Sequence, residues 1–211
     1  IMTDMVKPYV VGIDVGGTNT AFGIVDANGK VIASSSIKTQ QFGADLDAYI
    51  NELHSALSKL IAENGGIEKI KGIGVGAPNA NYYTGNIENA ANLPWKGTIE
   101  FAKILTNKFG VPCTLTNDAN AATIGEMMYG AAKGMKDFIM ITLGTGVGSG
   151  IVCNGKLVYG HDGNAGELGH VIVRRGGRQC GCGQKGCLET YTSATGIIRS
   201  AQELLQASNE P

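Results

Sequence analysis

One stretch of this sequence occurs twice, and the repeat limits the folds open to the chain. Residues 13–25 align without a gap with residues 141–153, so that Ile-Asp-Val-Gly-Gly-Thr matches Ile-Thr-Leu-Gly-Thr-Gly. After two skipped residues, Asn-Gly-Lys-Val at 28–31 aligns with Asn-Gly-Lys-Leu at 154–157. Each copy holds three apolar runs separated by a glycine turn and an Asn-Gly turn, which is typical of a three-stranded antiparallel meander. Any two hairpins share some of these features, but three matching elements in one order favour duplication and hence two related lobes.

The remaining pattern predicts an α/β chain. Apolar runs bounded by glycine, proline or asparagine predict strands, and apolar residues at helical spacing predict amphipathic helices. In the first lobe and into the second, the expected strands cover 9–15, 21–25, 31–36, 73–76 and 111–116, and the expected helices cover 45–64, 98–109, 118–129 and 192–207. We expect residues 1–117 to form the first lobe and residues 118–211 to form the first part of the second.

Charge balance and cysteine usage narrow the class of protein. A net charge of -1 gives no sign of a nucleic-acid or membrane partner. No apolar run reaches the ~18 residues of a membrane span, and residues 1–8 lack the features of a secretory signal, so we expect a soluble cytoplasmic protein. Three of the five cysteines are clustered, and Cys113 and Cys153 lie in apolar runs, which favours a metal site and reduced thiols over disulfides.

A set of metal ligands lies between residues 167 and 189. It consists of His170, Cys180, Cys182 and Cys187, with the carboxylates of Glu167 and Glu189 at its two ends. Three thiolates and an imidazole suit tetrahedral Zn²⁺. Four protein ligands leave no open position for water or substrate, so we expect the zinc to be structural. A redox couple fits less well, because the spacing is C-x-C and not C-x-x-C.

The two glycine turns are candidate phosphate-binding loops. They consist of Gly16, Gly17, Thr18 and Asn19 in the first copy and of Gly144, Thr145 and Gly146 in the second. Glycine lets backbone N–H groups approach an anion, and hydroxyl or amide side chains add donors. Neither turn has the lysine of a P-loop or the pattern of a Rossmann turn, and each by itself is more typical of a plain hairpin. Asp14 precedes the first turn in an apolar strand, where a buried carboxylate needs a partner such as hydrated Mg²⁺.

Asn117 and Asp118 stand where a buried strand ends and a helix begins. Aspartate is a favoured N-cap, which requires no further function. The small residues that follow leave open space around the carboxylate, and a helix N-terminus keeps it ionised. It is equally suited to orient a substrate hydroxyl and to accept its proton late in phosphoryl transfer. The spacing leaves both interpretations open.

Five motifs together resemble the ROK family (repressor, open reading frame, kinase). In chain order they are Asp14-Val-Gly-Gly-Thr18, Leu115-Thr-Asn-Asp118, Leu143-Gly-Thr-Gly-Val-Gly148, Glu167-Leu-Gly-His170 and Cys180-Gly-Cys-Gly-Gln-Lys-Gly-Cys-Leu-Glu189. They are spread over residues 10 to about 190, and the cysteine motif is highly specific. The resemblance implies the actin-like, ribonuclease H-like ATPase fold of two lobes, in agreement with the repeat. It also implies an ATP-dependent sugar kinase similar to the bacterial glucokinases.

The resemblance assigns roles to individual residues. Asp118 is implied to be the base for the 6-hydroxyl of a hexose, with glucose to glucose 6-phosphate as the leading reaction and fructose or N-acetylmannosamine as alternative substrates. The other sugar hydroxyls are implied to be held by Asn92, Asn117, Glu167, His170 and Glu189. The two glycine turns are implied to hold the ATP phosphates with Asp14 near Mg²⁺, and His170 to serve both zinc and sugar.

Two features depart from the family pattern. The usual Gly-x-Pro-Gly turn appears as Gly76-Ala-Pro78-Asn79, so we expect a slightly different sugar-side loop. Family kinases run on for roughly a hundred residues more, a typical length for half a domain. We therefore expect the second lobe to be incomplete and this chain alone to phosphorylate little.

Two further expectations come from the family. The alternative to a kinase is a sugar-sensing transcription regulator, but such regulators carry a winged helix-turn-helix before a first strand that here begins at Tyr9. Because family kinases are often dimers or tetramers, we expect a homo-oligomer whose partners are a hexose and ATP.

Overall fold

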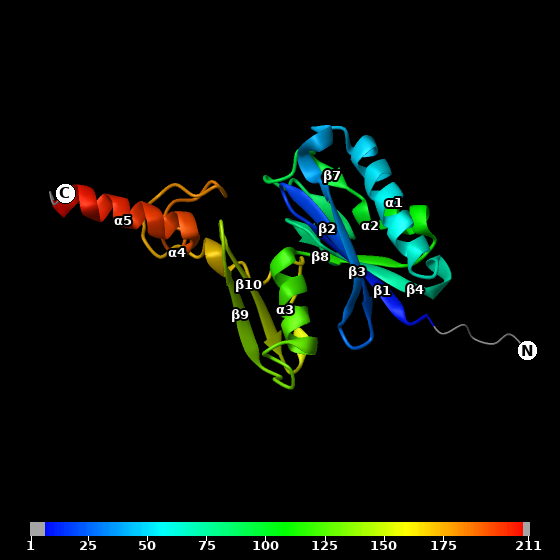
Figure 1. Cartoon of the computed structure of the whole chain (residues 1–211). Helices are drawn as coiled ribbons and strands as arrows, with labels where there is room; N and C mark the ends of the chain where they lie inside the picture. Colours follow the sequence, from blue (N-terminus) through cyan, green and yellow to red (C-terminus); the bar gives the residue numbers. More distant parts are fainter. Residues whose placement is uncertain (1–6, 209–211) are drawn as a thin grey trace, which may run out of the picture. The chain divides into compact units, whose positions relative to one another are not determined.

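The computed structural model describes residues 7–208, which form a mixed α/β structure (Figure 1). The chain divides into two compact units, Ile1–Lys133 and Gly134–Pro211. The two units are defined by their compactness, and the division between them falls after Lys133. The lobe boundary expected after residue 117 stays a prediction. No helix in the described part of the chain is both long and apolar enough to cross a membrane.

The first unit is built on a five-stranded sheet with the order β3-β2-β1-β4-β8. Its strands are β1 (Tyr9–Val15), β2 (Asn19–Asp26), β3 (Val31–Lys38), β4 (Ile70–Gly76) and β8 (Cys113–Thr116). β1, β2 and β3 form the predicted antiparallel meander, and β4 and β8 run parallel to β1. β8 begins two residues later than expected, because Pro112 has no N–H to donate to a neighbouring strand.

Three helices accompany this sheet. The expected helix over 45–64 is α1 (Leu46–Glu63), which begins where the Asp45 side chain accepts a hydrogen bond from the Ala48 N–H. α3 (Asp118–Tyr129) also matches its prediction. α2 (Phe101–Phe109) is shorter than the predicted 98–109, because Thr98 and Ile99 form a strand instead.

That strand belongs to a small second sheet, which the sequence did not predict. It is built from β5 (Ala80–Asn81), β6 (Asn86–Glu88) and β7 (Thr98–Ile99). Single turns of 3₁₀ helix at Thr39–Phe42 and Ile67–Lys69 complete the connections. The small sheet lies within the connection between β4 and α2.

The second unit contains the second meander. Its elements are β9 (Phe138–Leu143), β10 (Val147–Cys153), β11 (Lys156–Leu157), the 3₁₀ turn η3 (Leu168–His170), α4 (Glu189–Thr192) and α5 (Ala194–Ser208). The sheet order β11-β10-β9 matches β3-β2-β1, so both copies of the repeat form the same meander. The helix expected from residue 192 begins at Ala194, after Ser193, whose side chain accepts a hydrogen bond from the Gly196 N–H.

Equivalent strands of the two meanders differ in burial. In β1, Val11, Ile13 and Val15 are at most 4% exposed and belong to a core that includes the inward side chains of α1. In β9, the equivalent residues 139, 141 and 143 are an isoleucine, an isoleucine and a leucine that are 56%, 55% and 65% exposed. The described residues of the second unit therefore supply no layer comparable to α1.

Candidate functional site

In the first unit, three parallel strands end at one edge of the sheet. β1, β4 and β8 are in register through Asp14, Gly76 and Thr116, so the loops that follow these residues share that edge. Ligands of open α/β sheets bind at the carboxyl ends of such strands. An ideal Cβ at Gly76 would lie 3.1 Å from the Ala121 Cβ and 3.7 Å from the Asp118 Cα, so glycine lets the beginning of α3 pack against β4.

The N-cap of α3 is Asn117 and not Asp118. The Asn117 Oδ1 accepts a hydrogen bond from the Asn120 N–H at 2.7 Å. Asp118 is the first helical residue, and its Oδ1 accepts a hydrogen bond from the Ala119 N–H at 2.8 Å. Its side chain is exposed at the edge where the strands end. The interpretation of Asp118 as an N-cap is therefore wrong, and its carboxylate needs another explanation.

Asp14 is exposed, in contrast to the buried carboxylate expected from the sequence. The reason is the alternation of side chains along β1, which turns Val11, Ile13 and Val15 inward and Asp14 outward. Although the side chain reaches solvent, part of it is removed from water, and this desolvation raises the pKa of the Asp14 carboxyl. The negative charge of Asp118 raises that pKa further. The Asp14 and Asp118 carboxylates are thus close enough to repel each other, so a cation bound at this edge of the sheet would relieve the repulsion.

The first glycine hairpin is held from behind by hydroxyl groups. The Gly16 N–H donates to the Asn19 carbonyl at 3.0 Å, and the Thr39 hydroxyl donates to the Gly16 carbonyl at 2.7 Å. The buried Thr20 hydroxyl bonds to that of Thr39 at 2.9 Å and to that of Tyr49 at 2.7 Å. Sequence reasoning missed this support; a threonine in an apolar strand was its one visible signal.

Asn92 lies against this hairpin. Its loop is closed by a hydrogen bond from the Asn89 N–H to the Gly97 carbonyl at 2.9 Å. Leu93 and Trp95 are buried, and the Trp95 ring packs 4.3 Å from that of Tyr49, centroid to centroid. The Asn92 side chain is exposed. We call residues 89–97 the Asn92 loop.

The departure from the family's Gly-x-Pro-Gly turn has a local explanation. Asn79 adopts a φ of 51°, a left-handed conformation that glycine takes freely and that asparagine tolerates better than other residues. Its Nδ2 donates to the Glu88 carbonyl at 3.1 Å, and the Glu88 N–H donates to the Asn79 carbonyl at 3.0 Å. Asn79 thus preserves the turn and ties it to β6.

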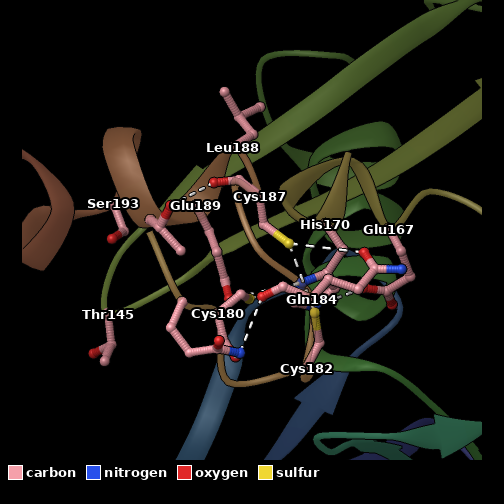
Figure 2. Close-up of polar contacts among 12 residues, drawn as sticks. Thr145, Glu167, His170, Cys180, Cys182, Gln184, Cys187, Leu188, Glu189 and Ser193 are labelled. Carbon is pink, nitrogen blue, oxygen red and sulfur yellow. Dashed lines mark hydrogen bonds and ion pairs between the residues drawn. The ribbon is translucent and has the colours of Figure 1, made fainter. Parts of the chain in front are cut away.

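In the second unit, the predicted metal ligands lie together (Figure 2). The ligand atoms of His170, Cys180, Cys182 and Cys187 are all within 4.8 Å of one another. The Cys180 Sγ is 3.6 Å from the His170 Nδ1, and the Cys182 and Cys187 Sγ atoms are 3.6 Å apart. All five cysteines are free. Three sulfurs and one nitrogen at this spacing form a group that fits a tetrahedral metal ion.

The two carboxylates lie on opposite sides of His170 (Figure 2). A Glu189 oxygen lies 3.7 Å from the Nδ1, and a Glu167 oxygen lies 3.9 Å from the Nε2. The Cys180 thiol donates to the Glu189 Oε1 at 2.9 Å. Because the Nδ1 faces the sulfur cluster, a metal ion there would take the Nδ1 and leave the Nε2 on the side of Glu167.

The second glycine hairpin lies beside Glu189. The Gly144 N–H donates to the Gly146 carbonyl at 3.0 Å, and the Ala194 N–H donates to the Gly144 carbonyl at 2.9 Å. The Thr195 hydroxyl approaches the Thr145 carbonyl at 3.4 Å. The hairpin is therefore attached to the beginning of α5, directly after the helical turn that starts with Glu189.

Arg178 connects the cysteine loop to the helices and was missed by sequence reasoning. Its side chain is only 9% exposed, and its guanidinium lies over the Tyr191 ring at 4.7 Å from the centroid. The guanidinium donates to four acceptors, which are the Thr190 carbonyl, the Gly196 carbonyl, the Ser200 hydroxyl and the Glu203 carboxylate. Arg178 is one of three arginines in this glycine-rich loop, and the sequence gives no signal for its distant contacts.

The predicted site residues thus form one group in each unit. In the first unit, the sheet edge carries Asp14, the hairpin from Gly16 to Asn19, Asn92, Asn117 and Asp118. In the second unit, the hairpin from Gly144 to Gly146, Glu167, the Cys₃His group and Glu189 lie together. Each group combines a glycine hairpin with polar side chains.

Comparison with known proteins identifies relatives of the whole sequence. Residues 10–210 match the ROK family. A glucokinase of Halalkalibacterium halodurans is 40% identical over 92% of this chain and 59% of its own length. A xylose repressor of Bacillus spizizenii is 30% identical over 92% of this chain and 50% of its own length.

Among solved structures, a ROK family glucokinase from Streptomyces griseus in complex with glucose and AMPPNP is similar to this chain. It superposes with a TM-score of 0.76 at 33% identity, over 94% of this chain and 62% of its own length. The chain spans 59% to 62% of the length of the curated glucokinases that it matches.

Proposed function

The chain belongs to the ROK family and has its actin-like ATPase fold, and on that premise we propose that the protein is an ATP-dependent hexose kinase. The leading reaction is the conversion of glucose to glucose 6-phosphate. The observation that carries the proposal is the position of Asp118. Its carboxylate is exposed where three strands end, close to Asp14, while Asn117 performs the capping.

In this proposal, Asp118 orients the 6-hydroxyl of the sugar and accepts its proton. The hydrogen bond from the Ala119 N–H and the N-terminus of α3 both favour the ionised carboxylate. An alcohol is a much weaker acid than a carboxyl group, so the proton moves late and orientation is the larger contribution. The hydroxyl oxygen attacks the terminal phosphorus of ATP, and ADP leaves.

We assign the remaining sugar hydroxyls to five polar side chains, which are those of Asn92, Asn117, Glu167, His170 and Glu189. Carboxylates accept hydrogen bonds from vicinal hydroxyls, and the Nε2 of His170 can exchange a hydrogen bond with another. The opposite positions of Glu167 and Glu189 about His170 support this assignment.

We assign the ATP phosphates to the hairpins Gly16–Asn19 and Gly144–Gly146, whose N–H groups and hydroxyls are donors for anions. The charge of Mg²⁺ would neutralise phosphate oxygens. Asp14 suits a hydrated Mg²⁺, since Asp118 already raises its pKa and a nearby cation would relieve that repulsion.

The Cys₃His group is proposed to bind one structural Zn²⁺. Three thiolates and the His170 Nδ1 fill a tetrahedral set, which leaves the metal no position for chemistry. Its contribution would be to fix the cysteine loop and thereby the orientation of His170 and Glu189.

The alternative within the family is a sugar-sensing regulator, which the 30% identity to a xylose repressor favours. Fructose and N-acetylmannosamine remain alternative substrates for a kinase. The cytoplasmic location and the homo-oligomeric state expected from the sequence stay predictions, the second of which sedimentation velocity would measure.

A coupled assay on the full-length gene product decides between these proposals. ADP release is followed with ATP, Mg²⁺ and a panel of glucose, mannose, fructose and N-acetylmannosamine. The proposal expects turnover with glucose to be the fastest. Binding of a sugar without turnover on any member of the panel would contradict the kinase proposal and favour the regulator.

A further inference from the structure

The two glycine hairpins share a contact that phosphate binding does not require. In the first hairpin, an ideal Cβ at Gly17 would lie 2.8 Å from the backbone carbonyl oxygen of Asn92 and 3.6 Å from its Cβ. Real Cβ atoms do not approach an oxygen so closely, so any side chain at position 17 must displace the Asn92 loop. The loop therefore reaches its present position because residue 17 is glycine.

The Asn92 loop cannot shift as a whole, because most of it is held in place. Leu93 and Trp95 are 2% and 4% exposed, and the Trp95 ring is packed on Tyr49. The loop ends are joined by the hydrogen bond between Asn89 and Gly97. A shift forced at residue 92 would consequently concentrate on the exposed Asn92 itself.

In the second hairpin, an ideal Cβ at Gly146 would lie 2.9 Å from the Oε2 of Glu189. This oxygen is the far end of the flexible Glu189 side chain. A methyl group at residue 146 would therefore turn the carboxylate without moving the backbone of the cysteine loop. The affected group is again one to which the proposed function gives a sugar-binding role.

Not every glycine has such a neighbour. Gly125 lies in α3, where an ideal Cβ has no atom within 4 Å, and its φ is not positive. Position 125 thus tolerates a methyl group by space and by backbone conformation. Because the proposed function gives Gly125 no role, Gly125→Ala is a suitable control.

We propose that Gly17 and Gly146 are positioning residues for the sugar, each of which lets a sugar-binding group seat against a phosphate-binding hairpin. The inference rests on the proposed function. In each unit the glycine joins the nucleotide side to the sugar side, through the Asn92 loop in the first and through the Glu189 carboxylate in the second. Both contacts lie at the turn between the first and second strands of the repeat, although the alignment matches Gly17 with Thr145 and Gly146 with Thr18.

The test compares Gly17→Ala and Gly146→Ala with Gly125→Ala in steady-state kinetics with glucose and ATP. Small displacements of positioning groups cost up to about a hundredfold, so we expect KM for glucose to rise about ten- to hundredfold in the first two variants. Their KM for ATP should rise less than their KM for glucose, and Gly125→Ala should leave KM for glucose unchanged. A rise in KM for ATP alone in Gly17→Ala and Gly146→Ala would overturn the proposal.

Double variants separate positioning from a general structural effect. If Gly146 acts through Glu189, Gly146→Ala adds no further rise in KM for glucose to a protein that already carries Glu189→Ala. The same holds for Gly17→Ala combined with Asn92→Ala. If the rises in KM for glucose are additive in both double variants, the proposal is overturned, because the glycines would then act independently of the Glu189 and Asn92 side chains.

A binding measurement keeps the inference separate from the proposed function. Trp95 is the sole tryptophan and lies in the Asn92 loop, so its fluorescence reports glucose binding without ATP. If no hexose is phosphorylated, the kinase proposal fails while the inference still predicts weaker glucose binding in Gly17→Ala and Gly146→Ala than in Gly125→Ala. Equal affinities in the three variants would contradict the inference, and circular dichroism confirms that each variant is folded.

Discussion

Arg178→Met removes the group that ties the cysteine loop to α4 and α5. The guanidinium donates to the Thr190 and Gly196 carbonyls at 2.7 and 3.0 Å and to two side chains, and it is only 9% exposed. A buried acceptor that loses its partner costs about 1–3 kcal/mol. The Glu203 carboxylate is 51% exposed and adds less than about 1 kcal/mol. With two carbonyls left without this donor, we expect a loss of about 3 kcal/mol in the stability of this region.

The assay is hydrogen exchange, followed by mass spectrometry of peptides from residues 174–190. Because every 1.4 kcal/mol corresponds to a tenfold change, amide exchange in these peptides should accelerate about a hundredfold. Trp95 fluorescence is unsuitable here, because that residue belongs to the other compact unit.

Arg199→Met is the matched control. Arg199 also pairs with Glu203, at 2.9 Å, but its side chain is 57% exposed and bonds along a single helix. Its loss should cost no more than about 0.5 kcal/mol. Equal exchange in Arg178→Met and Arg199→Met would refute the reasoning, because burial of the Arg178 network would then contribute nothing.

Three further predictions concern the metal, the hairpin support and the sheet edge. Metal analysis should find about one zinc per chain, lost with Cys180→Ser, whereas a folded metal-free protein would contradict the Cys₃His assignment. Thr20→Val leaves the Tyr49 hydroxyl without its 2.7 Å partner and should lower the free energy of unfolding in urea by about 1–3 kcal/mol; an unchanged midpoint would disagree. Burial and Asp118 raise the folded-state pKa of Asp14, so its carboxylate opposes folding above that pKa and ceases to do so below the ordinary value of 3.8. Without nucleotide and Mg²⁺, Asp14→Asn should therefore raise the melting temperature at pH 7 and lose this advantage toward pH 3.5; an advantage that grows on acidification would be inconsistent.

The elements with a long periodic pattern were predictable from the sequence. α1 follows from apolar residues at helical spacing over five turns, and the meanders follow from their turns and the repeat. β7 has two residues and no periodicity, and only its pairing with β6 distinguishes it from the first turn of α2. The exposure of Asp14 was available from the alternation of β1, which the sequence interpretation did not apply.

The candidate site was predictable to the extent that its residues are neighbours in the sequence. The Cys₃His group lies within a short segment, and the structure brings its ligand atoms together. Sequence spacing could not decide whether Asn117 or Asp118 caps α3, because both are good N-caps and the choice depends on the residue at which the backbone becomes helical. Arg178 and Thr39 act on residues far along the chain, and no local pattern marks such contacts.

The most direct test of the central claim is the turnover of Asp118→Asn with glucose and ATP, measured beside glucose binding by Trp95 fluorescence. Asparagine keeps the shape of the side chain but accepts no proton, and Asn117 still caps the helix. We predict that kcat falls about 10²–10⁴-fold while the affinity for glucose changes little. An unchanged kcat would contradict the assignment of Asp118 as the base and with it the proposed mechanism.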